Sequence, residues 1–250
     1  MINLKTTREL RYMRDAGKIS QEALLKAGEA VRPGVSTLEL DKIVRRTIEK
    51  AGAVPSFLGY GGFPASACIS VNNVVIHGIP SAHEILKEGD IVSIDVGAIY
   101  EGFNGDNAWT FPCGKVSEEA QKLMDATRES LFLAIEKAVP GNRIGDIGSA
   151  VQQYVEARSY SVVRDFVGHG VGAKLHEDPS VPNYGTPGRG VRLLPGMTIA
   201  IEPMVTQGSC EVKILKDGWT TVTKDGKLAA HFEHSIAITP DGPVILTSLD

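Results

Sequence analysis

An internal repeat constrains the fold of this chain more than any other sequence feature. One landmark is a Pro-Gly pair, which occurs at Pro33-Gly34 and again at Pro140-Gly141. The other is a segment, since 88–95 resembles 195–202, with Gly89 matching Gly196. The two landmarks recur at an identical offset, which predicts a duplicated unit in which two helices precede a strand. The alternative is a coincidental match, since the two segments share few identical residues.

Capping motifs and hydrophobic periodicity predict the elements of each half. Two helices are expected within residues 1–52, each opening on a capping box of the form Ser/Thr-x-x-Glu, and two more at 118–139 and 147–157. Alternating β-branched and aromatic residues predict strands at 91–100, 103–111, 198–205, 220–223 and 231–239. No linker interrupts the 250 residues, so we expect one α/β (α+β) domain over residues 1–250.

Composition narrows the class of protein. Hydrophobic residues make up 42% and charged residues 22% of the chain, as in ordinary globular proteins. The net charge of −4 and the absence of a basic stripe argue against a nucleic-acid partner. There is no apolar run long enough to span a membrane and no signal-peptide pattern. Three widely separated cysteines suit a reducing compartment, so a cytoplasmic location is expected.

Two aspartates are expected to share one face of a hairpin. Asp95 lies in a β-branched run, where an uncompensated carboxylate is costly to bury. Asp106 follows eleven residues later across a turn at 101–102. Facing positions in such a hairpin differ by an odd number, so both carboxylates point to the same side and repel each other unless a cation lies between them. Alternatively, one is a turn or N-cap residue and the other pairs with arginine.

Further acids complete a candidate metal centre. Glu202 occupies the place of Asp95 in the second half, and Glu233 also lies in an apolar strand, while His169 has glycine on both sides. The four acids carry a charge of −4, which two divalent cations would neutralise. An oxygen-rich set with one histidine favours manganese, iron, cobalt or zinc. The sequence has no P-loop, serine elbow or His-Glu-x-x-His motif, so metal-assisted hydrolysis is the chemistry left.

The chain resembles type I methionine aminopeptidases over essentially its whole length. The resemblance rests on an ordered set of motifs: Ile76–Pro80, Ile94–Gly97, Asn104–Asp106, Gly168–Gly172, Leu175–Glu177, Ile201–Met204 and Phe232–His234. It implies the pita-bread fold, with duplicated halves, a curved antiparallel sheet and outer helices. It also implies an enzyme that removes N-terminal methionine from nascent proteins and peptides whose second residue is small.

The resemblance also implies the metal ligands. Asp95 would chelate one ion, and His169 and Glu202 the other. Asp106 and Glu233 would bridge the two ions. Glu202 would in addition act as general base for the attacking water. The physiological metal is not fixed by the sequence.

Two other histidines and a pocket follow from the same resemblance. His176 would donate a hydrogen bond to the scissile carbonyl oxygen, and His77 would contact the substrate near the cleaved bond, although His77 taken alone also suits a packed histidine. The methionine pocket would be made by apolar and aromatic side chains and one histidine: Phe57, Tyr60, Phe63, Cys68, His77 and Trp219. The expected partners of a monomeric enzyme are methionyl peptides and nascent chains, with the ribosome as a candidate docking partner.

Three positions depart from the family pattern or stay open. Asn107 stands where the family often has threonine or serine, which bears on metal preference through a lost hydroxyl. Gly61 stands where some relatives have histidine and is expected to widen the pocket mouth. His231 precedes Glu233 by two residues, so it either supports the metal site or is a packed strand histidine.

Other members of the same fold are the alternatives. A prolidase or aminopeptidase P would carry an additional N-terminal domain, for which this chain is expected to have no room. A non-catalytic binding module would have lost ligands and tends to be basic. A creatinase-like lyase would lack the full ligand set. The presence of all five ligand candidates favours the aminopeptidase.

Overall fold

The computed structural model describes residues 2–249, so residues 1 and 250 of the expected domain lie outside it. The helices are α1 (Thr7–Glu29), α2 (Thr37–Lys50), α3 (Glu118–Glu136) and α4 (Ile144–Glu156), with a 3-10 turn η1 (Tyr60–Gly62). The strands are β1 (Val54–Pro55), β2 (Ala67–Val71), β3 (Val74–Ile76), β4 (Ile91–Tyr100), β5 (Phe103–Pro112), β6 (Ser161–Val162), β7 (Gly168–Gly170), β8 (Glu177–Val181), β9 (Thr198–Ile201), β10 (Met204–Thr206), β11 (Val212–Ile214), β12 (Thr221–Thr223), β13 (Ala229–His231), β14 (Glu233–Thr239) and β15 (Gly242–Ile245).

Both predicted capping boxes are present at the first two helices. At the start of α1, the Glu9 carboxylate accepts from the backbone N–H of Thr6 at 2.7 Å, and the Thr6 hydroxyl accepts from the Glu9 N–H at 3.3 Å. Ser36 and Glu39 repeat this arrangement at α2. Each box satisfies backbone N–H groups that lack a partner within the helix, which fixes where the helix begins.

The internal repeat is present in the structure. The residue numbers at which α1 and α3 end differ by the same amount as those at which α2 and α4 begin. This amount is also the offset between the two Pro-Gly pairs. The connecting turns make equivalent hydrogen bonds: Gly34 N–H donates to the Leu86 carbonyl at 2.8 Å, and Gly141 N–H donates to the Leu193 carbonyl at 3.1 Å. Both glycines have a positive φ, which L-residues rarely adopt. The two halves therefore share one helix–turn–helix design, and α4 begins three residues earlier than expected.

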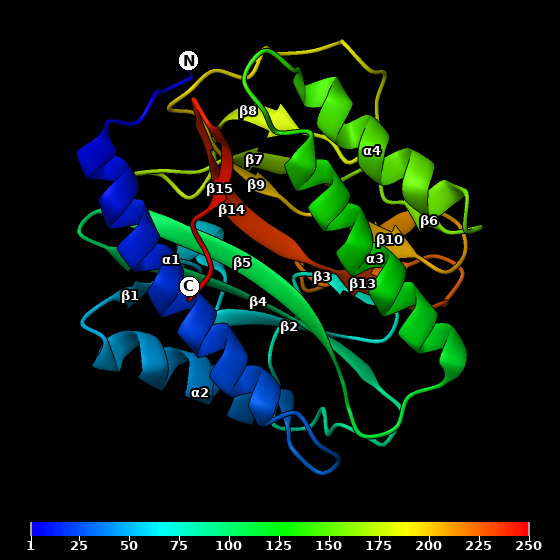
Figure 1. The fold of residues 1–250 in the computed structure, drawn as a ribbon. Coiled ribbons are helices and arrows are strands. Elements are labelled where there is room, and N and C mark those ends of the chain that lie inside the picture. Colours follow the sequence, from blue (N-terminus) through cyan, green and yellow to red (C-terminus); the bar gives the residue numbers. More distant parts are fainter. Residues whose placement is uncertain (1, 250) are drawn as a thin grey trace.

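The halves join through one antiparallel nine-stranded sheet. Its order is β1-β4-β5-β14-β9-β7-β8, with β2 also paired to β4 and β15 to β14. The β5–β14 pairing connects the first half to the second. Figure 1 shows the curved sheet with α1 and α2 over one half and α3 and α4 over the other. The predicted fold class, a curved antiparallel sheet with outer helices, is confirmed.

Each helix pair covers its half of the sheet with a separate apolar core. Under α1 and α2 the core includes Leu24, Leu40 and Ile94, all 1% exposed or less. Under α3 and α4 it includes Leu131 and Ile199, which are fully buried. Burying one such side chain stabilises the fold by about 1.5–3 kcal/mol. Because the helices occupy this outer face, the inner face is left for polar side chains.

Two predicted strands are interrupted, which corrects the sequence-based assignment. The expected strand 198–205 splits into β9 and β10 around Glu202, and 231–239 splits into β13 and β14 just before Glu233. Pro203 lacks an N–H and cannot continue the ladder. Beyond the breaks, β10 and β13 pair with each other and belong to a small sheet with β6. Both glutamates therefore lie where a strand passes between two sheets.

Within residues 2–249 the structure has the helices α1 to α4 and the 3-10 turn η1. None of them combines the length and the apolar character that crossing a bilayer requires.

Candidate active site

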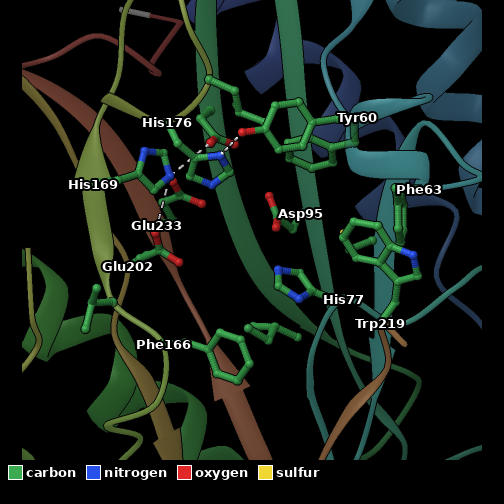
Figure 2. Close-up of a pocket in the computed structure, with 16 residues that line it drawn as sticks. Tyr60, Phe63, His77, Asp95, Phe166, His169, His176, Glu202, Trp219 and Glu233 are labelled. Carbon is green, nitrogen blue, oxygen red and sulfur yellow. Dashed lines mark hydrogen bonds and ion pairs between the residues drawn. The ribbon is translucent and has the colours of Figure 1, made fainter. Parts of the chain in front are cut away.

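Five neighbouring strands each place one metal-ligand candidate at the same cavity. In sheet order β4-β5-β14-β9-β7, these residues are Asp95 on β4, Asp106 on β5, Glu233 at the start of β14, Glu202 directly after β9, and His169 on β7. Figure 2 shows the labelled members of this set pointing toward a common space. The strand order thus brings together residues from both halves of the repeat.

The register of β4, β5 and β14 fixes the positions of three carboxylates. Asp106 pairs with Gly97, two residues beyond Asp95, so both aspartates project from one face as predicted. Ala108 on β5 pairs with Asp95 on one side and with Glu233 on the other. The three acids therefore surround Ala108, whose small side chain leaves room above the sheet.

His169 is held with one ring nitrogen free to face the acids. Its Nδ1 lies 2.8 Å from the Gly170 carbonyl, and because a carbonyl only accepts, Nδ1 carries the ring proton. Its Nε2 lies 3.6 Å from Asp106 Oδ2 and 3.5 Å from Glu202 Oε1. Ligand atoms of Asp106, His169 and Glu233 all lie within 4.8 Å of one another. A lone pair on Nε2 beside carboxylate oxygens is the arrangement that a metal ion needs.

The four carboxylates are buried together without a fixed cation. Burial raises the pKa of Asp106 to about 7. Burial and mutual repulsion raise the pKa values of the other three acids well above their ordinary range. Within residues 2–249, the ion-pair partners of Asp106 and Glu202 are histidines. Burial lowers the pKa of His169 to about 4, so His169 is neutral at pH 7.

The donor set fits divalent metal ions. One oxygen each of Asp95, Asp106 and Glu233 is buried without a hydrogen-bond partner. Leaving buried carboxylate oxygens unpaired is costly, and a cation would satisfy them. Four carboxylates and one imidazole form a mainly oxygen donor set that suits first-row divalent ions.

An apolar cavity of about 180 Å³ adjoins the acids. It is lined by all five metal-ligand candidates and by every predicted substrate residue: Phe57, Tyr60, Phe63, Cys68, His77, His176 and Trp219. It is also lined by four residues that the sequence analysis did not assign to a pocket: Ile76, Phe166, Val167 and Leu175. Three of these directly precede His77, Gly168 or His176, and Phe166 comes one residue before Val167. Their proximity in sequence to the motif residues is the signal that could have identified them.

Aromatic rings form one wall of this cavity. The rings of Phe63 and Trp219 pack edge to face with centroids 5.2 Å apart, and His77 packs edge-on against Trp219 and Phe166. Cys68 pairs with Asp95 across β2 and β4, and burial raises the pKa of its thiol, which stays neutral. A wall of aromatic rings and a neutral thiol suits an unbranched apolar side chain.

Two histidines face the cavity without belonging to the acid cluster. His77 directly follows β3 with a φ of 58°, and burial lowers its pKa to about 4. His176 directly precedes β8, and the centroids of the His176 and His169 rings lie 4.2 Å apart. Burial also lowers the pKa of His176. Both imidazoles are neutral at pH 7 and can donate or accept a hydrogen bond.

The structure decides the open positions at His231 and Asn107. His231 Nε2 is buried, lacks a hydrogen-bond partner and lies 3.7 Å from Glu202 Oε2, so this histidine contacts the acid cluster. The Asn107 amide donates to Gln21 of α1 at 2.5 Å, on the opposite face from the acids. A hydroxyl at position 107 would therefore not reach the acids, and the expected effect on the metal is not supported.

Gly61 lies beside Trp219 in the pocket wall, and its expected effect on the pocket mouth stays a prediction. It has a φ of 57°, and a Cβ built on it would lie 3.2 Å from the indole of Trp219. The Trp219 ring therefore occupies the space beside Gly61, which shapes the pocket wall.

Comparison with known proteins identifies the family of this chain. Residues 11–240 match the model of metallopeptidase family M24. The chain is 60% identical to the methionine aminopeptidase of Clostridium perfringens, with 99% of each chain covered. It superposes on the crystal structure of methionine aminopeptidase from Thermotoga maritima with a TM-score of 0.98 and 48% identity, covering 99% of this chain and 100% of the other. The prolidase of Pyrococcus furiosus shares the fold at a TM-score of 0.79 and 25% identity, but this chain covers only 66% of it.

The match to family M24, together with the buried carboxylate cluster on the inner face of the sheet, makes this protein a metallopeptidase. The chain belongs to metallopeptidase family M24, and within it to the methionine aminopeptidases. The family predicted from the motifs is confirmed, and the match to relatives of nearly equal length favours it over a prolidase.

Proposed function

We propose that this protein removes the N-terminal methionine from peptides and nascent proteins whose second residue is small. The observation that carries the proposal is the meeting of five ligand candidates beside an apolar pocket lined by Phe63, Trp219 and Cys68. Hydrolysis needs the acid cluster, and recognition of methionine needs the pocket. Because both line one cavity, a methionine side chain in the pocket would lie next to the bond that the acid cluster acts on.

In the proposed site, Asp95 would hold one divalent ion, His169 and Glu202 would hold a second, and Asp106 and Glu233 would help to hold both. Two divalent cations bound there would polarise the peptide carbonyl and increase the acidity of water. The four carboxylates neutralise the charge of two such ions. The free Nε2 of His169 matches its proposed role as a ligand.

The remaining groups act on the substrate directly. Glu202 takes the proton from the attacking water, since its carboxylate lies at the cavity beside His169. His176 donates to the carbonyl oxygen of the bond that breaks and to the negative charge that develops there. His77 contacts the substrate next to that bond and closes the cavity with Phe166.

The acid cluster also explains why a single residue is removed. A free α-amine offers a lone pair to a cation or a positive charge to a carboxylate, whereas an internal peptide nitrogen offers neither. The pocket wall formed by Phe63 and Trp219 then accepts one side chain before the reacting bond. The proposed enzyme is therefore an exopeptidase that removes only the first residue of its substrate.

The remaining assignments are part of the same proposal. The ions are cobalt, manganese, iron or zinc, and two are bound per chain. The enzyme is a single catalytic domain that acts as a cytoplasmic monomer on nascent chains, with the ribosome as a candidate partner.

Methionine release tests the proposed function. Metal-free protein is incubated with Met-Gly-Met-Met and with each divalent metal in turn, and free methionine is quantified by mass spectrometry. Acetyl-Met-Gly-Met-Met, which lacks the free amine, is the blocked control, and Ala-Pro tests the prolidase alternative. Release from the free peptide alone supports the proposal. No release with any metal, or cleavage of Ala-Pro only, contradicts it.

A further inference from the structure

Two adjacent histidines have different hydrogen-bond partners at the same ring atom. His169 Nδ1 faces the Gly170 carbonyl at 2.8 Å, and His176 Nδ1 faces the Tyr60 hydroxyl at 2.7 Å. The centroids of the two rings are 4.2 Å apart, so the two histidines share one environment. A carbonyl can only accept, whereas a hydroxyl can also donate. The partner at Nδ1 therefore allows the two neighbours to hold opposite tautomers.

The two roles proposed for these histidines require opposite tautomers. A metal ligand needs a lone pair on the nitrogen that faces the ion, and the Gly170 carbonyl supplies this by holding the His169 proton on Nδ1. A donor to a carbonyl oxygen needs its proton on the nitrogen that faces the substrate. For His176 this requires a partner at Nδ1 that donates, and the Tyr60 hydroxyl is such a group.

The backbone around Tyr60 holds this hydroxyl in place. Tyr60 lies in the turn η1, between Gly59 and Gly62, whose φ values are 82° and 88°. The Tyr60 N–H donates to the Phe57 carbonyl at 3.0 Å, and the Phe63 N–H donates to the Tyr60 carbonyl at 2.9 Å. Tyr60 comes from the first half of the chain and His176 from the second, so their hydrogen bond joins the two halves beside the cavity (Figure 2).

We infer that Tyr60 is a positioning residue for His176. Its hydroxyl donates to His176 Nδ1, which keeps the ring proton on Nε2 and orients that N–H toward the carbonyl oxygen of the substrate. This inference rests on the proposed function, because it gives His176 a carbonyl to act on. It assigns to Tyr60 a role that its ring, as part of the pocket wall, does not require.

The tautomer is measured directly in metal-free protein labelled with ¹⁵N-histidine. Two-bond ¹⁵N–¹H correlation spectra distinguish protonated from unprotonated ring nitrogens, and the His176 signals are assigned by their loss in His176→Ala. We expect the proton on Nε2 of His176 in the wild type and a mixture of tautomers in Tyr60→Phe. The His169 signals, fixed by Gly170, should stay unchanged as an internal control. A wild-type His176 with its proton on Nδ1 overturns the inference.

Kinetics separate the hydroxyl from the ring. Tyr60→Phe keeps the ring and removes one hydrogen bond, so kcat should fall by about 3- to 10-fold while KM stays the same. Tyr12→Phe, which removes a hydroxyl that accepts from Arg8 at 2.9 Å on α1, is the matched control and should leave both constants unchanged. An unchanged kcat in Tyr60→Phe, or a change in KM alone, would assign Tyr60 to packing only.

A double variant tests whether the hydroxyl acts through His176. In a His176→Ala background, Tyr60→Phe should cause no further loss of kcat, because the group it positions is already absent. A further loss as large as in the wild type overturns the inference. The spectra decide the tautomer even if the wild type releases no methionine, so failure of the proposed function and failure of this inference are distinguishable.

Discussion

Asp95 and Asp106 lie on the same face of the β4–β5 hairpin, because Asp106 pairs with Gly97, two residues beyond Asp95. Each has a buried Oδ1 without a hydrogen-bond partner. Two unsatisfied carboxylates side by side destabilise the metal-free fold and create a strong site for cations. Stability and metal binding are therefore linked at this pair.

Replacing Asp106 should abolish activity and weaken metal binding. Asp106→Asn keeps the shape of the side chain but removes one of four negative charges from the cluster. We expect metal affinity to fall by about 100-fold or more, since changing even the groups that support metal ligands costs about 10- to 100-fold. Calorimetric titration with Mn²⁺ measures this, with Asp241→Asn in the exposed β14–β15 turn as control. Wild-type affinity in Asp106→Asn would contradict the proposed contact with both ions.

The contribution of Asp106 to the stability of the metal-free protein should fall as the pH rises. Burial raises the pKa of Asp106 from 3.8 to about 7, so the folded state holds a proton that the unfolded state has already released. The free energy of unfolding is therefore highest below pH 4 with respect to this group. It falls as the pH rises toward 7 and beyond, by on the order of 4 kcal/mol for a shift of this size.

Urea unfolding at pH 5, 6, 7 and 8 measures this dependence as the difference between the wild type and Asp106→Asn. The difference is needed because burial lowers the pKa values of His77 and His169 to about 4, so these histidines make the folded protein more stable as the pH rises over part of this range. The three other acids have pKa values raised in the same direction and add to the trend. Saturating Mn²⁺ should remove the decline, because bound cations favour the ionised carboxylates. A metal-free wild type that gains stability relative to Asp106→Asn between pH 5 and pH 8 would show that Asp106 does not titrate as expected.

Removing His176 should slow catalysis without removing metal. The loss of one hydrogen-bond donor to a developing oxyanion lowers kcat by roughly 10²- to 10³-fold. His176→Ala should show this loss with the metal content of the wild type, measured by elemental analysis. His83→Ala, at an exposed histidine outside the cavity, is the matched control. Loss of metal from His176→Ala would make it a ligand instead.

Peptides with a bulky second residue should resist cleavage. In the proposed complex the second side chain would lie between His77, His176 and the turn at 60–62, and a displacement of the carbonyl by about 1 Å costs about 10²-fold in rate. Met-Gly, Met-Ala and Met-Ser peptides should be cleaved, and Met-Leu and Met-Ile peptides should not. Competition experiments with pairs of peptides measure the ratio of kcat/KM. Equal rates for Met-Ala and Met-Leu would contradict this specificity.

Gly61→Ala should weaken methionine binding through Trp219. The new Cβ would lie 3.2 Å from the indole and displace it, which raises KM several-fold for methionyl peptides. The φ of 57° adds a strain of about 1–2 kcal/mol. Gly52→Ala has a similar φ of 75° and nothing within 4 Å, so it carries the strain without the crowding. A wild-type KM in Gly61→Ala, or an equal rise in both variants, would exclude displacement of Trp219 as the cause.

Local signals in the sequence were sufficient for much of the fold. The capping boxes at Thr6 and Ser36 involve atoms within three residues, so their hydrogen bonds could be predicted from spacing alone. The internal repeat predicted the helix pairs because both halves use the same turn geometry. The parity of Asp95 and Asp106 followed from the two-residue period of a hairpin whose strands are adjacent in sequence.

The tertiary structure alone decided which distant residues meet. The sequence could not place His231 against Glu202, or direct Asn107 toward α1, because these contacts depend on which strands become neighbours. The breaks at Glu202 and Glu233 likewise arise because their strands pass between two sheets. The sequence by itself determined the short-range geometry and the chemical types of the ligands. The order β4-β5-β14-β9-β7, set by long-range backbone pairing, decided that five of those side chains share one cavity.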